Sequence, residues 1–392
     1  MPSESHRIPL AVPCMSGNEW VYIKDCLDTN WVSYAGPYVD RFERELAAKA
    51  GSAHAVAVSS GTAALHMALI LAGVGADDEV IMPGLTFVAP ANAVRYCGAW
   101  PVFTDIRADD WQWDVGLVAE FLDAGCGMRD GRLVNKATGR RIAALLSVHL
   151  LGGMGDVEAV AELAARYELP LIEDAAECLG ATYKGRPVGA PIPNDKGPLR
   201  LVITSFNGNK IITTGGGGAI LTEDSATAVR ARHLTTTAKA DQIEFEHDEV
   251  GYNYRMTNIA AALGVAQLEH LEGYVERKRN IAARYAGVFC GTGITVHPEP
   301  AHCASTFWMY TVQTTGRARP VIDRLNDRGI QARPIWRPLH RLTPYSGCFV
   351  ATGMDVADDL CERCVSLPCS VQISAGEQEA VGAHLLENVS SA

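Results

Sequence analysis

The feature that most constrains the fold is an alternation of short apolar runs with amphipathic stretches over residues 55–233. Short apolar runs bounded by turn residues predict buried strands, and apolar residues at helical spacing between them predict helices. The predicted strands are Ala55–Ser59, Glu79–Pro83, Pro101–Asp105, Ile142–His149, Leu169–Asp174, Leu201–Phe206 and Ala219–Thr222, with helices over Thr62–Ala72, Val157–Tyr167 and Ala226–His233. This alternation predicts an α/β fold with a mainly parallel sheet covered on both faces, although chain order does not give strand order.

The C-terminal part of the chain suggests a second, smaller domain. A capped helix is predicted from Ser16 to about Asp28, and a longer Ala-rich helix over Ile259–Val275 follows a cap at Thr257 or Asn258. Beyond it the signals for helix and strand are mixed. We therefore predict a large domain over residues 1–275 and a smaller C-terminal α+β domain over residues 276–392.

Composition argues against several classes of protein. The net charge is −11 with no basic block, so binding to nucleic acid or to an anionic membrane is not expected. No signal peptide is visible, and no apolar run approaches the roughly 20 residues of a membrane span. The eleven scattered cysteines then indicate reduced thiols in a cytoplasmic protein. Cys361, Cys364 and Cys369 have no second pair of ligands nearby, so no metal site is expected.

A lysine occupies an unusual position in the predicted sheet. Ser205-Phe206-Asn207-Gly208-Asn209-Lys210 and the glycines at 215–218 lie between two apolar strands. Lysine is rarely buried unless it is paired or reacts, and glycine lets another group approach the backbone. The segment is interpreted as a Schiff-base lysine beneath a flat cofactor. A surface hairpin with a solvated lysine explains the segment equally well.

Two other strand ends carry groups that suit such a cofactor. Ser60, Gly61 and Thr62 open a helix directly after a strand, which is typical of a phosphate site and also of an ordinary N-cap. Phe87 follows the next strand, where it could stack on a ring or belong to the core.

A third strand end is acidic. Glu173, Asp174 and Glu177 follow the strand at Leu171, and a buried carboxylate there needs a cation, which a protonated pyridine nitrogen would supply. Solvated acids in a loop are the alternative, and this fits Glu173 better than Asp174.

Two loops carry groups suited to a polar substrate. The loop at Asn30–Gly36 holds aromatic and hydroxyl groups that suit a sugar or a base, and the segment Ala332–His340 holds arginines and a histidine that suit phosphate or carboxylate. A packed loop and a solvated surface loop are the respective alternatives.

The order of these motifs resembles the pyridoxal-phosphate sugar-nucleotide aminotransferases of the DegT type, which have the type I aminotransferase fold. The resemblance extends from Pro9 to about Pro368. It is strongest to enzymes that aminate C4 of a UDP-linked 2-acetamido-4-keto-6-deoxyhexose on routes to legionaminic acid or bacillosamine. The matching segments are 16–20, 31–33, 205–218, 251–255 and 338–340.

The resemblance implies a role for each matching residue. Lys210 would bind the cofactor covalently and later move a proton, and Asp174 would hold the pyridine nitrogen protonated. The other implied cofactor contacts are Ser60, Gly61, Thr62 and Ser205 at the phosphate, Phe87 on the ring, Glu177 near the ring hydroxyl, where relatives often carry Gln, and Asn253 reaching the cofactor of a second subunit. The implied substrate contacts are Trp31, Ser33, Arg255 and His340.

The predicted function is therefore amino transfer from L-glutamate, which leaves as 2-oxoglutarate, to C4 of a UDP-linked 4-keto-6-deoxy sugar by a homodimer, for surface glycans. A dTDP- or GDP-linked sugar is an alternative, and so is a regulatory protein that binds the cofactor without turnover. A sugar 3-dehydratase would carry His in place of Lys210, and a nicotinamide oxidoreductase would need a G-x-G-x-x-G turn that Ser60–Ala64 lacks. One segment departs from the family pattern: Gly189–Arg200 replaces a shorter connection and puts the local geometry near the active site in doubt.

Overall fold

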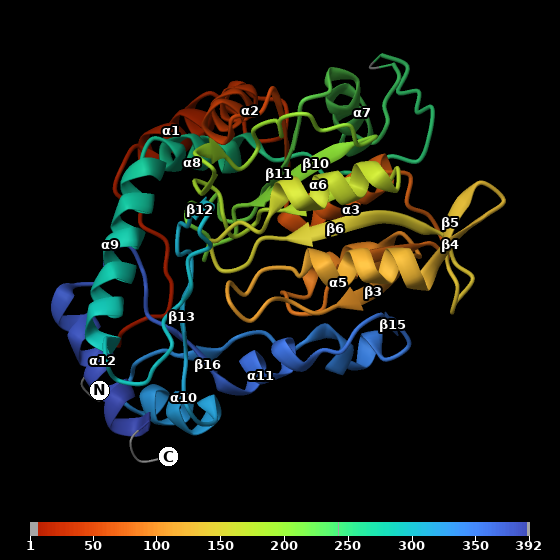
Figure 1. Cartoon of the computed structure of the whole chain (residues 1–392). Coiled ribbons are helices and arrows are strands. Elements are labelled where there is room, and N and C mark those ends of the chain that lie inside the picture. Colours follow the sequence, from red (N-terminus) through yellow and green to blue (C-terminus); the bar gives the residue numbers. More distant parts are fainter. Residues whose placement is uncertain (1–6, 242, 390–392) are drawn as a thin grey trace.

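The computed structural model describes residues 7–241 and 243–389 and is built around an eight-stranded mixed sheet (Figure 1). The strand order is β1-β11-β10-β7-β6-β2-β3-β15. β11 runs antiparallel to β1 and β10, which flank it, and every other neighbouring pair in this sheet is parallel. The bounds are β1 (His54–Val58), β2 (Glu79–Pro83), β3 (Trp100–Thr104), β6 (Ile142–Val148), β7 (Leu171–Asp174), β10 (Arg200–Ser205), β11 (Gly218–Thr222) and β15 (Phe349–Val350). The seven predicted strands and the fold class are confirmed.

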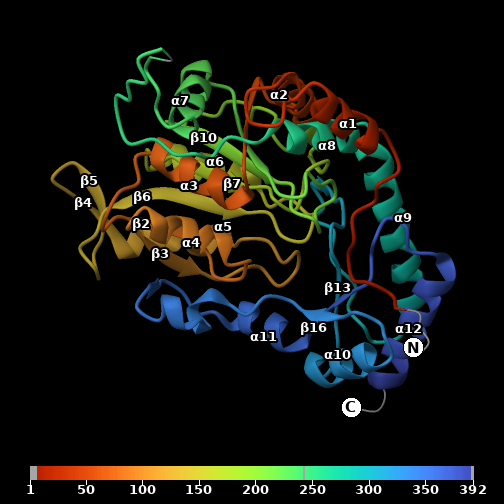
Figure 2. The same ribbon diagram turned by 180° about the vertical axis from the view of Figure 1, so that it is seen from behind.

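Helices cover both faces of this sheet (Figures 1 and 2). Alternate residues of a strand point to opposite faces, and in β1 Val56 and Val58 join one core while Ala55 and Ala57 join the other. The first core contains residues of α3 (Gly61–Leu71), α4 (Ala89–Tyr96) and α7 (Ser225–Thr235). The second contains residues of α2 (Pro37–Ala50), α5 (Val115–Glu120), α6 (Val157–Arg166) and α8 (Asn258–Leu268).

The long helix predicted over Ile259–Val275 is two helices, so this prediction is wrong. The first, α8, ends at Leu268, and α9 (Leu271–Phe289) begins after a turn at His270. Leu268 and Leu271 are both buried, so the apolar pattern continues across the break and does not reveal it. From there α9 runs along the side of the molecule toward the C-terminal helices (Figure 1). The predicted domain boundary at residue 275 falls inside α9 and stays a prediction.

A second sheet of three antiparallel strands forms the centre of the smaller part. Its order is β13-β16-β14, with bounds β13 (Tyr310–Gln313), β16 (Cys364–Leu367) and β14 (Arg333–Pro334). The helices α10 (Ala318–Asp327), α11 (Asp355–Arg363) and α12 (Ala375–Val389) lie close to it (Figures 1 and 2). The N-terminal segment also lies here, because Ile8 N–H donates to the Gly329 carbonyl (3.0 Å) and the Leu10 carbonyl accepts from Cys369 N–H (2.8 Å).

The remaining elements are short, apart from the N-terminal helix. They are α1 (Glu19–Asp28), η1 (Phe121–Gly125), β4 (Cys126–Arg129), β5 (Arg132–Asn135), β8 (Thr182–Tyr183), β9 (Arg186–Pro187), β12 (Cys303–Ala304), η2 (Leu339–Arg341) and η3 (Thr343–Tyr345). Within the described residues, no helix combines the length and the apolar character needed to cross a bilayer. All eleven cysteines are described and have free thiols, as predicted.

Candidate active site

Lys210 lies in the loop that joins β10 to β11. Two backbone hydrogen bonds close the base of this loop, from Phe206 N–H to the Gly217 carbonyl (2.8 Å) and from Thr214 N–H to the Phe206 carbonyl (3.0 Å). The Phe206 ring is buried against Phe42. The Lys210 side chain is only 13% exposed. The structure therefore shows a tight turn that carries a largely buried lysine side chain, and the alternative of a solvated lysine is wrong.

Asp174 ends β7, which pairs in parallel with β10. Its carboxylate is buried and accepts a hydrogen bond from the Ala176 N–H (2.9 Å). Burial raises the pKa of Asp174, and the Ala176 N–H, Lys210 and His149 offset only part of that rise. No ion pair to Asp174 is found among the described residues. A buried carboxylate in this state would be stabilised by a cation beside it.

Glu177 lies one turn beyond Asp174 and faces the lysine. One carboxylate oxygen accepts a hydrogen bond from the Leu151 N–H (2.8 Å), and the other lies 3.9 Å from Lys210 Nζ. Burial raises the pKa of Glu177 to about 7, although the charge of Lys210 and the Leu151 N–H oppose this rise. The backbone N–H therefore orients the side chain so that its free oxygen points toward the amine.

The start of α3 offers backbone N–H groups to an anion. Ser60 caps the helix by accepting a hydrogen bond from Ala63 N–H (3.0 Å), and Gly61 is the first helical residue. A Cβ added to Gly61 would lie 2.8 Å from the Cβ of Ser205, so glycine is needed for this close approach. The hydroxyls of Ser60 and Ser205 and the bare backbone between them form a cradle that suits a phosphate at a helix N-terminus.

These groups line a single cavity of about 340 Å³. Its wall includes Ser60, Gly61, Thr62, Phe87, Asp174, Glu177, Ser205 and Lys210 of the predicted set, together with Thr86, Asn207, Asn209, Trp308 and Trp336. Phe87 is 52% exposed, which suits a ring-stacking side chain better than the alternative of a core residue. A buried acid that lacks a cation, an adjacent lysine and an anion cradle together fit pyridoxal phosphate.

Comparison with known proteins agrees with this site. The model of the DegT/DnrJ/EryC1/StrS aminotransferase family matches residues 13–386. The chain belongs to this family. It is 37% identical to the GDP-perosamine synthase of Escherichia coli O157:H7 over 94% of each chain. It is also 30% identical to the UDP-4-amino-4-deoxy-L-arabinose–oxoglutarate aminotransferase of Shewanella sediminis (strain HAW-EB3), over 83% of this chain and 80% of that one.

The solved structures agree with the family assignment. The structure of Streptomyces venezuelae DesV in complex with a ketimine intermediate superposes with a TM-score of 0.84 at 30% identity, over 95% of this chain and 94% of that chain. The protein is thus a sugar aminotransferase that depends on pyridoxal phosphate. Its type I fold is confirmed.

Four predicted substrate contacts of this aminotransferase do not line the cavity of their own chain. Trp31 and Ser33 are exposed, and their carbonyls accept hydrogen bonds from Asn258. The guanidinium of Arg255 donates to Glu43 (2.6 Å), and His340 lies 3.4 Å from Asp358. Arg255 thus has a structural partner within the chain. The roles of Trp31, Ser33, Arg255 and His340 stay predictions.

Asn253 is exposed and does not line the cavity either. Its backbone forms an isolated bridge with Thr236. An exposed position is what a contact to a second subunit requires, so this role also stays a prediction.

The segment Gly189–Arg200, which departs from the family pattern, does not line the cavity around Lys210. It precedes β10 and lines a separate hollow with Leu221 and Thr227, whereas the cofactor groups follow the other end of β10. Arg200, at the end of this segment, donates to Glu173 (2.5 Å) and to the Ala190 carbonyl (2.9 Å). The unusual segment therefore supports the strand from the edge opposite the site.

Two tryptophans in the cavity wall were not recognised as site residues in the sequence. Trp308 precedes β13 and Trp336 follows β14, so both come from the smaller part of the molecule. Trp336 belongs to the cationic and aromatic segment Ala332–His340, which singled out the region but not the residue. Trp308 has no motif around it, and only the packing of the second sheet onto the first brings it here.

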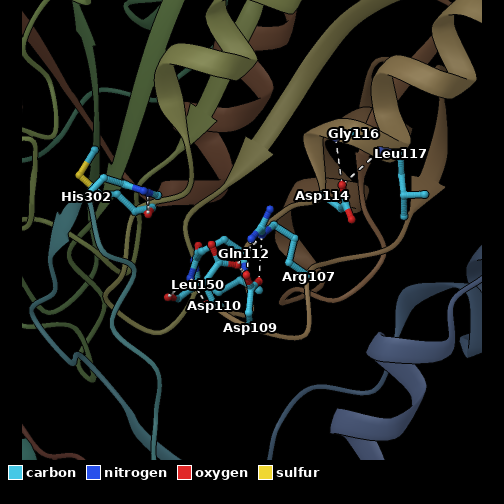
Figure 3. Close-up of polar contacts among 10 residues, drawn as sticks. Arg107, Asp109, Asp110, Gln112, Asp114, Gly116, Leu117, Leu150 and His302 are labelled. Carbon is cyan, nitrogen blue, oxygen red and sulfur yellow. Dashed lines mark hydrogen bonds and ion pairs between the residues drawn. The ribbon is translucent and has the colours of Figure 1, made fainter.

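A larger hollow of about 830 Å³ lies elsewhere, between the segment at Arg107–Gly116, α6 and residues 299–302. Figure 3 shows four of the side chains that line it: Arg107, Asp109, Asp110 and His302. Four of its five acids have a partner within the chain, among them Glu299, which pairs with Arg279. Arg107 pairs with Asp109 and Asp110, and Asp156 caps α6 through Ala159 N–H. This hollow contains no lysine and shares no residue with the cavity around Lys210.

Proposed function

We propose that this aminotransferase moves an amino group from L-glutamate to C4 of a UDP-linked 2-acetamido-2,6-dideoxy-4-hexulose. The product would be an amino sugar for surface glycans, and 2-oxoglutarate would leave as the second product. One observation carries the proposal: Lys210, Asp174 and the anion cradle at Gly61 line one cavity. Family membership and a relative that is named for oxoglutarate support it.

The residues of the cavity have different roles in this proposal. The cofactor, when bound, supplies a ring that accepts electrons. Lys210 moves a proton at the reacting carbon, because its amine lies in the wall of the cavity and can act as a base. Asp174 keeps the ring nitrogen charged, while Ser60, Thr62 and Ser205 hold the phosphate and prevent rotation of the ring. Glu177 faces the amine and, in this proposal, the ring hydroxyl.

We further propose that the active unit is a homodimer. Large apolar side chains are exposed on α1 and on the loop that follows it, and Trp20 at 72% is the most exposed of them. The others on this surface are Val21, Leu27, Trp31, Val32 and Tyr34. An exposed apolar surface of this kind typically marks a contact with another protein, and a twofold dimer is the commonest assembly. A second copy would bury these side chains and would bring Trp31, Ser33 and Asn253 toward the partner's cavity.

The nucleotide is where the sequence motifs and a named relative differ. The motifs at 205–218 and 251–255 favour a UDP sugar. The relative from Escherichia coli, at 37% identity, is named for a GDP sugar, so a GDP-linked 4-keto-6-deoxy sugar is the second candidate.

The experiment is a panel of UDP-, GDP- and dTDP-linked 4-keto-6-deoxy sugars with L-glutamate, analysed by mass spectrometry for the amino product. We expect the highest kcat/KM for the UDP-linked 2-acetamido sugar. A higher kcat/KM for the GDP or dTDP sugar would overturn the nucleotide assignment. If no keto sugar is aminated by protein that has bound the cofactor, the proposed function fails. Lys210→Ala is the matched control for non-enzymatic product.

A further inference from the structure

The amine of Lys210 is held between two groups that come from different parts of the chain. On one side lies the free carboxylate oxygen of Glu177, at 3.9 Å. On the other lies the ring of Trp308, whose centroid is 4.0 Å from Lys210 Nζ. A cation over an indole face at this distance is attracted by the ring quadrupole, and Trp is the strongest partner of this kind. The ring therefore favours one position of the amine.

The same tryptophan also holds the backbone next to the lysine. Its indole N–H donates a hydrogen bond of 2.7 Å to the carbonyl of Asn209, the residue before Lys210. Asn209 is itself exposed, so few other contacts restrain this part of the loop. One side chain thus fixes both the loop that carries the lysine and the end of the lysine side chain.

Trp308 is itself held firmly. It is 5% exposed, and its carbonyl accepts a contact from the Cys369 thiol (3.6 Å). Gly152, at φ +103°, lies so close that an added Cβ would be 2.5 Å from Trp308 N. The Gly152 carbonyl accepts a hydrogen bond from Thr306 N–H (3.0 Å). The turn at residues 151–152 thereby places both flanking groups, since Leu151 N–H orients Glu177.

We propose that Trp308 is a positioning residue for Lys210. Its ring keeps the amine directed into the cavity, and its N–H holds the loop against the second sheet. The consequence is faster attachment of the cofactor, because the nitrogen is already directed at the aldehyde. In this step the Lys210 ammonium releases one proton to solvent, the neutral nitrogen bonds to the aldehyde carbon, and its two remaining protons leave with the aldehyde oxygen as water. This inference rests on the cofactor chemistry of the proposed function, but not on the identity of the sugar.

The test measures attachment rather than turnover. Cofactor-free protein is mixed with pyridoxal phosphate, the visible absorbance is followed in time, and borohydride trapping with peptide mass spectrometry confirms Lys210 as the site. Trp308→Leu removes both contacts, and we expect attachment about tenfold slower. Trp308→Phe keeps a ring but lacks the N–H, and we expect it to be about threefold slower.

Trp100→Leu is the matched control, because it removes an indole that also stacks on a cation (Arg95) and donates an N–H hydrogen bond (to Asp77), but that lies outside the cavity. Its attachment rate should stay within about twofold of wild type. Circular dichroism and thermal unfolding establish that each variant is folded, and if Trp308→Leu does not fold, Trp308→Phe alone decides. Attachment at the wild-type rate in the folded Trp308 variants, or equal slowing in Trp100→Leu, would overturn the inference. Normal attachment with no amination of any sugar would reject the proposed function and leave the role of Trp308 standing.

Discussion

Glu173 and Asp174 are neighbours on β7 and have opposite environments. Both carboxylates are buried. Glu173 is bonded by Arg200 (2.5 Å) and by His149 (3.0 Å). Burial would raise the pKa of Glu173, but these two partners lower it to about 2. Burial raises the pKa of Asp174, and no described side chain pairs with it.

The difference separates a structural acid from the acid that we propose to pair with the cofactor. Successive residues of a strand point to opposite faces, so Glu173 faces the side covered by α6 while Asp174 faces the cavity beside α3. An acid whose charge is balanced within the chain stabilises the fold. An acid left without a cation at the end of a strand is available for the charge that the cofactor brings. Substitution of each acid tests this contrast.

The largest effect is expected for Lys210→Ala. Loss of the amine removes both the covalent link to the cofactor and the proton transfer, so turnover of L-glutamate and keto sugar should fall roughly ten-thousandfold. The variant should still bind pyridoxal phosphate, as shown by equilibrium dialysis. Residual turnover within tenfold of wild type would exclude Lys210 as the reactive amine.

Glu173→Gln should lower the stability of the fold and leave catalysis unchanged. Removing one partner of a buried ion pair leaves Arg200 and His149 without their anion, and we expect the free energy of unfolding to fall by about 3–5 kcal/mol. Urea unfolding measures this, and kcat per folded molecule should match wild type. Because the pKa of Glu173 is lowered, its stabilisation is complete above about pH 4.5 and is lost as the pH falls toward 2. A normal unfolding curve would contradict the structural role.

The contribution of Glu177 to stability should depend on pH in the opposite direction, which the Glu177→Gln variant tests. The pKa of Glu177 is about 7 in the folded protein, against an ordinary value of 4.5. The native state therefore retains a proton that the unfolded chain loses, and stability declines as the pH rises from 4.5 to 7. In cofactor-free protein, the variant should gain stability relative to wild type by up to about 3 kcal/mol above pH 7. Equal differences at pH 5 and pH 8 would refute this.

Asp174→Asn should reduce turnover on the order of a hundredfold, or about 2.7 kcal/mol in activation free energy, because the ring nitrogen loses the charge that keeps it protonated. Its stability should change little or improve, since the buried charge has no partner within the chain. Steady-state kinetics and urea unfolding together distinguish this variant from Glu173→Gln. A variant with normal kcat and lower stability would place Asp174 with Glu173 as a structural acid.

The smallest effect is expected for Asn253→Ala, which should weaken retention of the cofactor a few-fold through the loss of one hydrogen bond across the dimer. Fluorescence titration with pyridoxal phosphate measures this. Mixing the inactive Lys210→Ala protein with Asn253→Ala should yield sites that combine the intact residues of both subunits. A fully active monomer at assay concentration would rule out the shared site.

Local sequence was sufficient for much of the site. Lys210, Asp174 and the Ser60–Thr62 turn were predicted because strand ends and turn residues are local patterns. Local patterns were insufficient where the environment of a residue depends on a partner that is distant along the chain. A solvated loop acid is a credible alternative for Glu173 in the sequence, because its partner Arg200 is 27 positions away along the chain. The break between α8 and α9 was missed because buried leucines flank it on both sides.

The sequence by itself determined the strands, the helix that begins at Gly61 and the lysine turn, since each depends on residues within a few positions of one another. Only the tertiary structure decided which strand ends meet. The order β10-β7-β6 puts Lys210, Asp174 and Leu151 side by side although they are far apart in the chain. The tertiary structure also places Trp308, which comes just before the second sheet, against the lysine. The physical reason is that strand pairing and sheet packing are set by the burial of surfaces that no single segment contains.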